Sequence, residues 1–203
     1  MRQALENSTP KYAGIGIWLS VLCLFIGVNF AYLNAYRFNG ILNIDEAGYM
    51  RAAMMYVAAL KLGGVSHWAH ALLTPIGFAP LLPAVTSLLL FIGGISEKVA
   101  LCANTIMALF LFGVIYRFAE CISGRAIGLL ALLLVAALNE VQTYTTSFMF
   151  AIPTTLFFVS TIYCYSHSKN FTNQWWSLLL GLSLALMVLS RTMAIAFLPA
   201  FVL

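Results

Sequence analysis

The residue types best suited to chemistry in this chain gather in one segment, residues 43–51, which reads Asn-Ile-Asp-Glu-Ala-Gly-Tyr-Met-Arg. Asp45 and Glu46 are adjacent carboxylates, and a carboxylate within hydrogen-bond distance of a hydroxyl can act as its general base. Asp45 also suits the N-cap of a following helix, with Glu46 in the first turn, because helix N-termini favour negative charge. On spacing alone a capping role for Asp45 is the simpler interpretation, and a catalytic role stays open.

Cations elsewhere in the chain offer the complement that an anionic substrate would need. Arg191 is one candidate, because a guanidinium binds phosphate oxygens through a bidentate fork, although an interfacial anchor explains this residue equally well. His67 and His70 are candidates for contacting a phosphate or an acceptor, and interfacial polar residues beside Trp68 are the simpler interpretation. Two histidines without a third ligand do not predict a metal site. We expect no cofactor, with a divalent ion shared by Asp45 and Glu46 left open.

The elements that must position these residues are membrane helices. Of the 203 residues, 63% are hydrophobic and 8% are charged, whereas soluble domains carry about 25% charged residues. This composition excludes soluble enzymes, nucleic-acid-binding domains and secreted disulfide scaffolds. The net charge of +4 comes from basic residues at the ends of apolar runs, where such residues indicate topology and not a nucleic-acid partner.

Successive apolar runs predict an all-α, polytopic transmembrane helical bundle that forms a single domain over residues 1–203. The first run, 12–33, is longer than the core of a signal peptide, which favours a retained span. The later runs cover residues 74–95, 99–116, 126–138, 148–165 and 175–203. Each of the longest runs approaches the 20 or so apolar residues that cross a bilayer.

Residues 34–95 are predicted to form the first outer loop, with an amphipathic interfacial helix followed by a proline-kinked apolar helix. After the acidic pair, Tyr49 and Tyr56 recur at helical spacing with small apolar residues, while Glu46, Arg51 and Lys61 are expected on the polar face. Prolines at positions 75, 80 and 83 then interrupt the next apolar run, because proline breaks or kinks a helix interior.

The orientation depends on whether the run 74–95 crosses the membrane. If it does not cross, the cytoplasmic side receives Arg117, Arg125 and Lys169, and the short outer loops hold Lys98. The positive-inside rule favours that arrangement, which leaves the acidic pair outside. The last run then places Arg191 roughly 24 Å above the inner face, near the outer boundary of the membrane. A local break in the helix is expected beside Arg191.

The order of these features resembles the GT-C superfamily of membrane glycosyltransferases. The resemblance is strongest to the aminoarabinose transferase and protein O-mannosyltransferase-like families. It rests on a first span, an outer loop that opens with Asp45, Glu46 and Tyr49, and an apolar helix that contains prolines. Residues 180–191, Leu-Gly-Leu-Ser-Leu-Ala-Leu-Met-Val-Leu-Ser-Arg, also resemble a helix of this family that ends in a cation near the outer surface.

This resemblance implies transfer of a sugar from a polyprenyl-phosphate-linked donor to a lipid, glycan or protein acceptor, with inversion at the anomeric carbon. It implies a multi-pass protein of the bacterial inner (plasma) membrane, in contact with membrane lipids, with its active side facing outward. Asp45 would be the general base, with Glu46 beside it, and Arg191 would stabilise the leaving phosphate. The donor phosphate or the substrate would also contact Tyr49, Arg51, His67 and His70.

The sequence departs from the family pattern in several places. A second acidic residue is expected just before a proline-containing span, but the matching stretch 147–153 has none, and Glu140 is the nearest carboxylate. Thr74 precedes Pro75 where the family commonly has a basic residue. The last residues lie inside an apolar run, so we expect the chain to be an N-terminal fragment of a longer protein.

Two other classes of function remain open from the sequence. The first is a transporter or lipid-handling membrane protein, in which the helix at 74–95 gates a path and the outer charges select the substrate. Few ionisable residues within the spans and no internal repeat speak against it. The second is a truncated, non-catalytic relative that acts as a partner subunit. The missing second carboxylate motivates this hypothesis.

Overall fold

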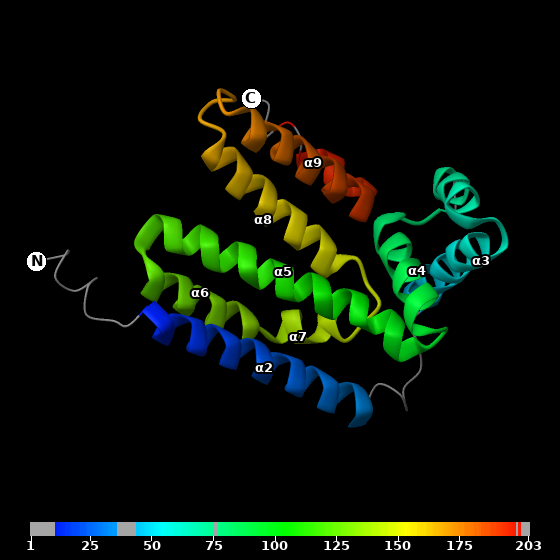
Figure 1. The fold of residues 1–203 in the computed structure, drawn as a ribbon, viewed down its shortest axis with the longest axis horizontal. Helices are drawn as coiled ribbons and strands as arrows, with labels where there is room; N and C mark the ends of the chain where they lie inside the picture. Colours follow the sequence, from blue (N-terminus) through cyan, green and yellow to red (C-terminus); the bar gives the residue numbers. More distant parts are fainter. Residues whose placement is uncertain (1–10, 36–43, 75–76, 198, 200–203) are drawn as a thin grey trace, which may run out of the picture.

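All regular secondary structure of the described residues is helical (Figure 1). The computed structural model describes residues 11–35, 44–74, 77–197 and 199. The prediction of an all-α membrane bundle is confirmed. The helices are α2 (Lys11–Ala35), α3 (Ile44–Leu73), α4 (Leu81–Gly93), α5 (Glu97–Ser123), α6 (Arg125–Ala136), α7 (Asn139–Thr145), α8 (Ala151–His167), α9 (Gln174–Ser190) and the 3-10 helix η2 (Thr192–Phe197).

Two described helices are long and apolar enough to cross a membrane alone. They are the Trp18–Ala35 part of α2, and α5. The pair α6 and α7 passes the same test together but bends by 64° at the break between them. The apolar run predicted at 126–138 is therefore a 12-residue helix followed by a sharp turn, and not a straight span. Helices α8 and α9 have 17 residues each, or about 25 Å.

Helix α5 is the centre of the bundle, with α2 and α6 on one side and α8 and α9 on the other (Figure 1). Its face toward the neighbours carries small, fully buried residues such as Ala100, Ala103 and Ala108. Small side chains let helix backbones approach closely, which drives packing in membranes. Helix α2 joins this centre through an edge-on ring contact of Phe25 with Phe112 at 4.7 Å between centroids.

The run at 74–95 differs from the predicted kinked helix. Helix α4 begins only at Leu81, and Pro83 lies in its first turn. The N–H groups of a first turn have no acceptor within the helix, so a proline there costs no hydrogen bond. The described prolines therefore precede or start the helix, and the prediction of a kink inside it is wrong. At 13 residues, α4 is about 20 Å long and too short for a hydrocarbon core of about 30 Å.

Helix α3 continues well beyond the predicted interfacial segment, to Leu73, and is broken inside. Gly63 and Gly64 have non-helical backbone angles, with Gly64 at φ 65° and ψ −158°. After the break, the Trp68 indole donates a hydrogen bond to Ser87 Oγ at 2.9 Å, which fixes this part of α3 to α4.

The bundle has two distinct ends, which we call the α4 end and the far end. Helices α5 and α8 run from the α4 end to the far end, and α9 returns (Figure 1). Arg117, Arg125 and Lys169 therefore share the far end, while Lys98 begins α5 at the α4 end. This grouping follows from the order of the later helices whether or not the run 74–95 crosses, so the crossing of that run and the side of the membrane that each end faces stay predictions.

Candidate functional site

The first turn of α3 carries the acidic pair, but not in the predicted positions. The helix begins at Ile44, so Asp45 lies inside the first turn and does not precede it as an N-cap. A carboxylate in the first turn still interacts favourably with the positive, N-terminal end of the helix dipole. Asp45 is exposed, so its carboxylate is accessible to a substrate. Glu46 is only 4% exposed, so the expectation that it lies on the polar face is wrong.

Tyr49 lies one turn after Asp45 and on the same face of α3, because residues four apart are neighbours on a helix. Its side chain is 6% exposed. Its ring lies 5.1 Å from the ring of Phe78 and 5.8 Å from the ring of Phe150, between centroids. Gly48 makes this packing possible, because a Cβ at that position would collide with the Phe78 ring.

Arg191 reaches the same region from the C-terminal end of α9. Its backbone is extended, with φ −154° and ψ 114°, so the predicted break beside it is confirmed. Just before the break, Ser190 Oγ donates a hydrogen bond to Thr154 Oγ1 of α8 at 3.0 Å. The exposed guanidinium lies 4.8 Å above the ring centroid of Phe150, within the range of a cation–π interaction.

The electrostatics of Tyr49 join the two charged residues into one cluster. Burial raises the pKa of Tyr49, the Asp45 carboxylate raises this pKa further, and the Arg191 guanidinium lowers it. Both charges therefore act on the same hydroxyl, although they come from opposite parts of the sequence. We call Asp45, Tyr49, Phe150 and Arg191 the acid–arginine cluster.

The remaining predicted site residues do not join this cluster. Arg51 is exposed and lies six residues after Asp45, well around the helix from it. His67 and His70 are exposed on the part of α3 beyond the glycine break, and His67 Nδ1 lies 3.1 Å from the Gly63 carbonyl oxygen. Within the described part of the chain, no contact connects either histidine with Tyr49 or Arg191.

One residue of the site was not predicted. Asn104 of α5 is fully buried, and its amide nitrogen lies within hydrogen-bond distance of three carbonyl oxygens before α8. These acceptors are Tyr144, Ser147 and Met149, at 3.2, 2.6 and 2.9 Å. The amide therefore fixes the turn that presents Phe150 to Tyr49 and Arg191. The available signal was a lone asparagine inside the apolar run 99–116, since polar side chains between membrane helices commonly hold them together.

Within the described residues, no other carboxylate replaces the missing second acidic residue of the family pattern, and no side-chain group is arranged to hold a metal ion. Glu140, the nearest carboxylate to the stretch that lacks an acidic residue, is exposed on α7. The described ranges contain no group of three histidine, cysteine, aspartate or glutamate side chains arranged to hold a metal ion. The charged groups that the cluster offers are one exposed carboxylate and one exposed guanidinium.

Such a pair can perform a displacement at a phosphate-linked carbon. A carboxylate can accept the proton of an attacking hydroxyl, and a guanidinium can stabilise the charge that develops on a leaving phosphate. The leaving group is itself an anion, so no general acid is needed. The aromatic floor under Arg191 holds the guanidinium in place while leaving its N–H donors accessible.

Comparison with known proteins identifies the family of this chain. Residues 74–203, nearly two thirds of the chain, match the family described as dolichyl-phosphate-mannose-protein mannosyltransferase. No curated protein and no solved structure matches the chain significantly. The matched region contains Asn104, Phe150 and Arg191, while the α3 residues precede it. The chain therefore belongs to the dolichyl-phosphate-mannose-protein mannosyltransferase family, and is a membrane glycosyltransferase of the GT-C type.

Proposed function

We propose that this chain transfers a sugar from a polyprenyl-phosphate donor to a lipid, glycan or protein acceptor at the outer face of a bacterial plasma membrane. Membership of the mannosyltransferase family supports the reaction class. The observation that supports the residue assignment is the packing around Phe150, whose ring lies 5.8 Å from the ring of Tyr49 and 4.8 Å from the Arg191 guanidinium. Asp45 lies one turn before Tyr49 on α3, so a candidate base and a candidate phosphate-binding cation belong to one region of the molecule.

In the proposed reaction, the acceptor hydroxyl attacks the anomeric carbon while Asp45 takes its proton. The bond between this carbon and the phosphate oxygen breaks on the opposite side, so the configuration inverts. The bonding electrons leave with the phosphate, and Arg191 stabilises their charge through charge-assisted hydrogen bonds. Tyr49 is proposed to position the substrate between the two groups.

The other predicted residues take lesser parts in this proposal. Glu46 is buried beside the base and is proposed to support the conformation of the first turn of α3. Arg51, His67 and His70 are exposed away from the cluster, where they are proposed to meet the acceptor or the headgroups around it. The reaction needs no metal ion to balance, and metal dependence is a separate measurement.

Replacing Asp45 with Asn tests the proposal. The amide keeps the size of the side chain but cannot accept the proton, so transfer should fall by about 100- to 10,000-fold. The measurement is product formation by the full-length protein from a polyprenyl-phosphate sugar, with expression and donor binding unchanged. Glu140→Gln is the matched control, because it neutralises another exposed carboxylate outside the cluster.

Full transfer by the Asp45→Asn variant would contradict the assigned base. Uptake of a substrate that depends on Asp45, with no transfer product formed, would instead indicate a transporter. Transfer that appears only when a second polypeptide is added would indicate a partner subunit.

A further inference from the structure

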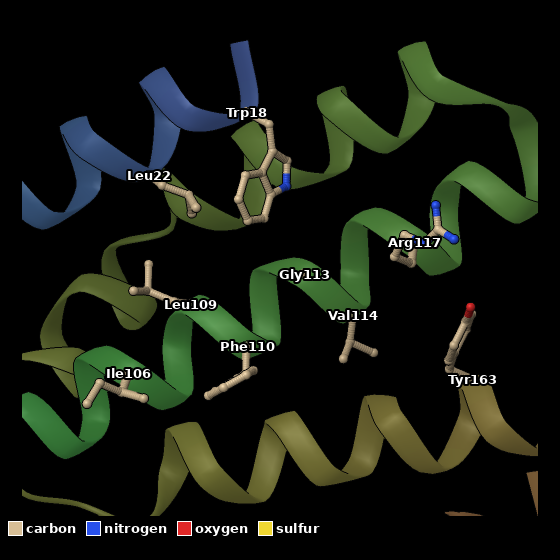
Figure 2. A pocket seen from close by; sticks show the side chains of 9 residues that line it. All are labelled: Trp18, Leu22, Ile106, Leu109, Phe110, Gly113, Val114, Arg117 and Tyr163. Atoms are coloured by element: carbon tan, nitrogen blue, oxygen red, sulfur yellow. The ribbon is translucent and has the colours of Figure 1, made fainter. Parts of the chain in front are cut away.

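A cavity of about 560 Å³ lies between α2, α5 and α8, away from the acid–arginine cluster (Figure 2). Helix α5 contributes Ile106, Leu109, Phe110, Gly113, Val114 and Arg117 to it. Trp18 and Leu22 of α2 and Tyr163 of α8 complete its wall. The Phe110 side chain is 64% exposed, so the cavity is a groove open to the surroundings and not an enclosed void.

The groove is apolar along its length and polar at one end. Figure 2 shows Arg117 and the Tyr163 hydroxyl together at that end, with Ile106 at the opposite end. From Ile106 to Arg117, α5 rises roughly 16 Å, which is about half of a hydrocarbon core of about 30 Å. The length therefore fits the acyl chain of a lipid from a single leaflet.

The polar end carries an excess of positive charge. An Arg117 Nη donates to Glu120 at 2.7 Å, and Arg125 Nε lies 3.5 Å from the other oxygen of the same carboxylate. Two guanidiniums share one carboxylate, which leaves one net positive charge. The Arg117 side chain is still 64% exposed, and a guanidinium has five N–H donors, so most of its fork stays accessible to an anion.

We propose that this groove binds one anionic glycerophospholipid from the leaflet at the far end of the bundle. The phosphate lies at Arg117 and Tyr163, and an acyl chain lies along Phe110 and Trp18. The charge at the polar end selects an anionic headgroup over a zwitterionic one, because basic side chains at a lipid surface attract anionic lipids. The bound chain fills the space between α2 and the rest of the bundle. The site shares no residue with the acid–arginine cluster, so it stands independently of the proposed reaction.

Quenching of Trp18 fluorescence by brominated lipids tests the proposal. The full chain is reconstituted in phosphatidylcholine vesicles that contain brominated phosphatidylglycerol or brominated phosphatidylcholine. The difference between the chain and its Trp18→Phe variant isolates Trp18 from the other three tryptophans. We expect phosphatidylglycerol to associate about fivefold more strongly, the factor that one basic side chain contributes at a lipid surface.

Two variants separate the site from general surface charge. Arg117→Gln should bring the ratio of phosphatidylglycerol to phosphatidylcholine association close to one. Arg117→Lys should keep part of the preference, which would show that a chain altered at this position still folds. Arg125→Gln is the matched control, because Arg125 is 61% exposed and contacts the same carboxylate but does not line the groove. It should keep the larger part of the preference, because the Arg117 fork that meets the phosphate remains, although the net charge beside the groove falls by one.

Equal quenching of the parent chain by both lipids would overturn the proposal. A loss of preference in Arg125→Gln as complete as in Arg117→Gln would also overturn it, because the selectivity would then come from the charged surface as a whole. Displacement of the brominated lipid by a smaller mole fraction of polyprenyl phosphate would assign the groove to that lipid and overturn the proposed occupant.

Discussion

The pKa of Tyr49 responds to Asp45 and to Arg191 in opposite directions, so its titration can report on the acid–arginine cluster without any assay of activity. Burial and Asp45 hold its pKa above the ordinary value of about 10, so the phenol stays protonated throughout the neutral range. Asp45→Asn removes a charge that raises this pKa and should lower it, while Arg191→Gln should raise it. The measurement is the absorbance of tyrosinate against pH, as the difference between each chain and its Tyr49→Phe counterpart.

The same titration affects stability. The folded chain holds the Tyr49 proton more tightly than the unfolded chain does, so the stabilising contribution is complete below about pH 10 and is lost as the pH rises through the folded pKa. Glu140→Gln should leave the Tyr49 midpoint unchanged. Identical midpoints in all three variants would mean that neither charge acts on Tyr49.

Single residues of the site were predictable where they follow local spacing. Asp45 and Tyr49 share a helix face because they are four positions apart, and the sequence is sufficient to see this. Glu46 was misplaced, although it lies three positions before Tyr49 and therefore belongs to the same inward periodicity. The prediction placed Glu46 on the polar face because of its charge and did not use this spacing. The approach of Phe150 to Arg191 depends on how α8 and α9 pack, which no local pattern encodes.

At the scale of the elements, Asn104 is the connection between α5 and the turn before α8. The Asn104 amide has two N–H groups to share among the three carbonyl oxygens, so replacing it with Ala removes about two hydrogen bonds, each worth about 0.5–1.5 kcal/mol net. We expect the free energy of unfolding to fall by about 2 kcal/mol and sugar transfer to fall with it, because Phe150 loses its support. Thermal unfolding in detergent measures the first effect.

The matched control is Asn34→Ala. Asn34 is exposed on α2 and donates only locally, to the Phe30 carbonyl oxygen at 2.8 Å. Its replacement should change stability by less than about 0.5 kcal/mol. Equal stability of the two variants would show that Asn104 does not hold the turn.

The break in α3 depends on Gly64, whose φ of 65° and ψ of −158° lie in a region that is essentially restricted to glycine. Gly64→Ala should therefore destabilise the chain by about 1–3 kcal/mol or straighten α3, which would separate Trp68 from Ser87. Trp68 fluorescence and thermal unfolding measure the two outcomes. Gly181→Ala is the control, since a Cβ there meets no atom within 4 Å and should leave stability equal or higher.

The elements that were predicted best are those defined by composition alone. The run 12–33 lies within α2 and the run 99–116 lies within α5, because each is apolar and free of proline. The run 175–203 instead ends its α-helix at Ser190, where the Ser190–Thr154 hydrogen bond and the extended Arg191 stop it. The start of α4 and the break in α3 depend on proline and glycine positions, whose effects vary with packing.

At the scale of the whole molecule, the two ends of the bundle should label from opposite sides of the membrane. In a background without the four cysteines, a single cysteine at Ala47 or Met193 should react with an impermeant reagent from the side that carries the cluster. A cysteine at Ser123 should react only from the other side, because α5 carries it to the far end. All three positions are exposed.

Labelling of Ser123 from the same side as Ala47 would contradict this arrangement and would separate Arg191 from Asp45 across the membrane. The grouping of Arg117, Arg125 and Lys169 at one end was predictable from the order of the apolar runs, and the positive-inside rule adds only the side that this end faces. That side and the depth of Arg191 in the membrane stay predictions, which this labelling tests.

The lengths of the helices carry a further consequence for the bilayer around them. Helix α5 rises about 40 Å over 27 residues, whereas α8 and α9 rise only about 25 Å over 17. This hydrophobic mismatch is relieved when the lipids beside α8 and α9 form a thinner membrane than those beside α5. We expect headgroups on that flank to lie closer to the bilayer midplane than those beside α5. The lipid-linked donor of the proposed reaction would then reach the Arg191 guanidinium by lateral diffusion, with its hydrocarbon tail still in the membrane.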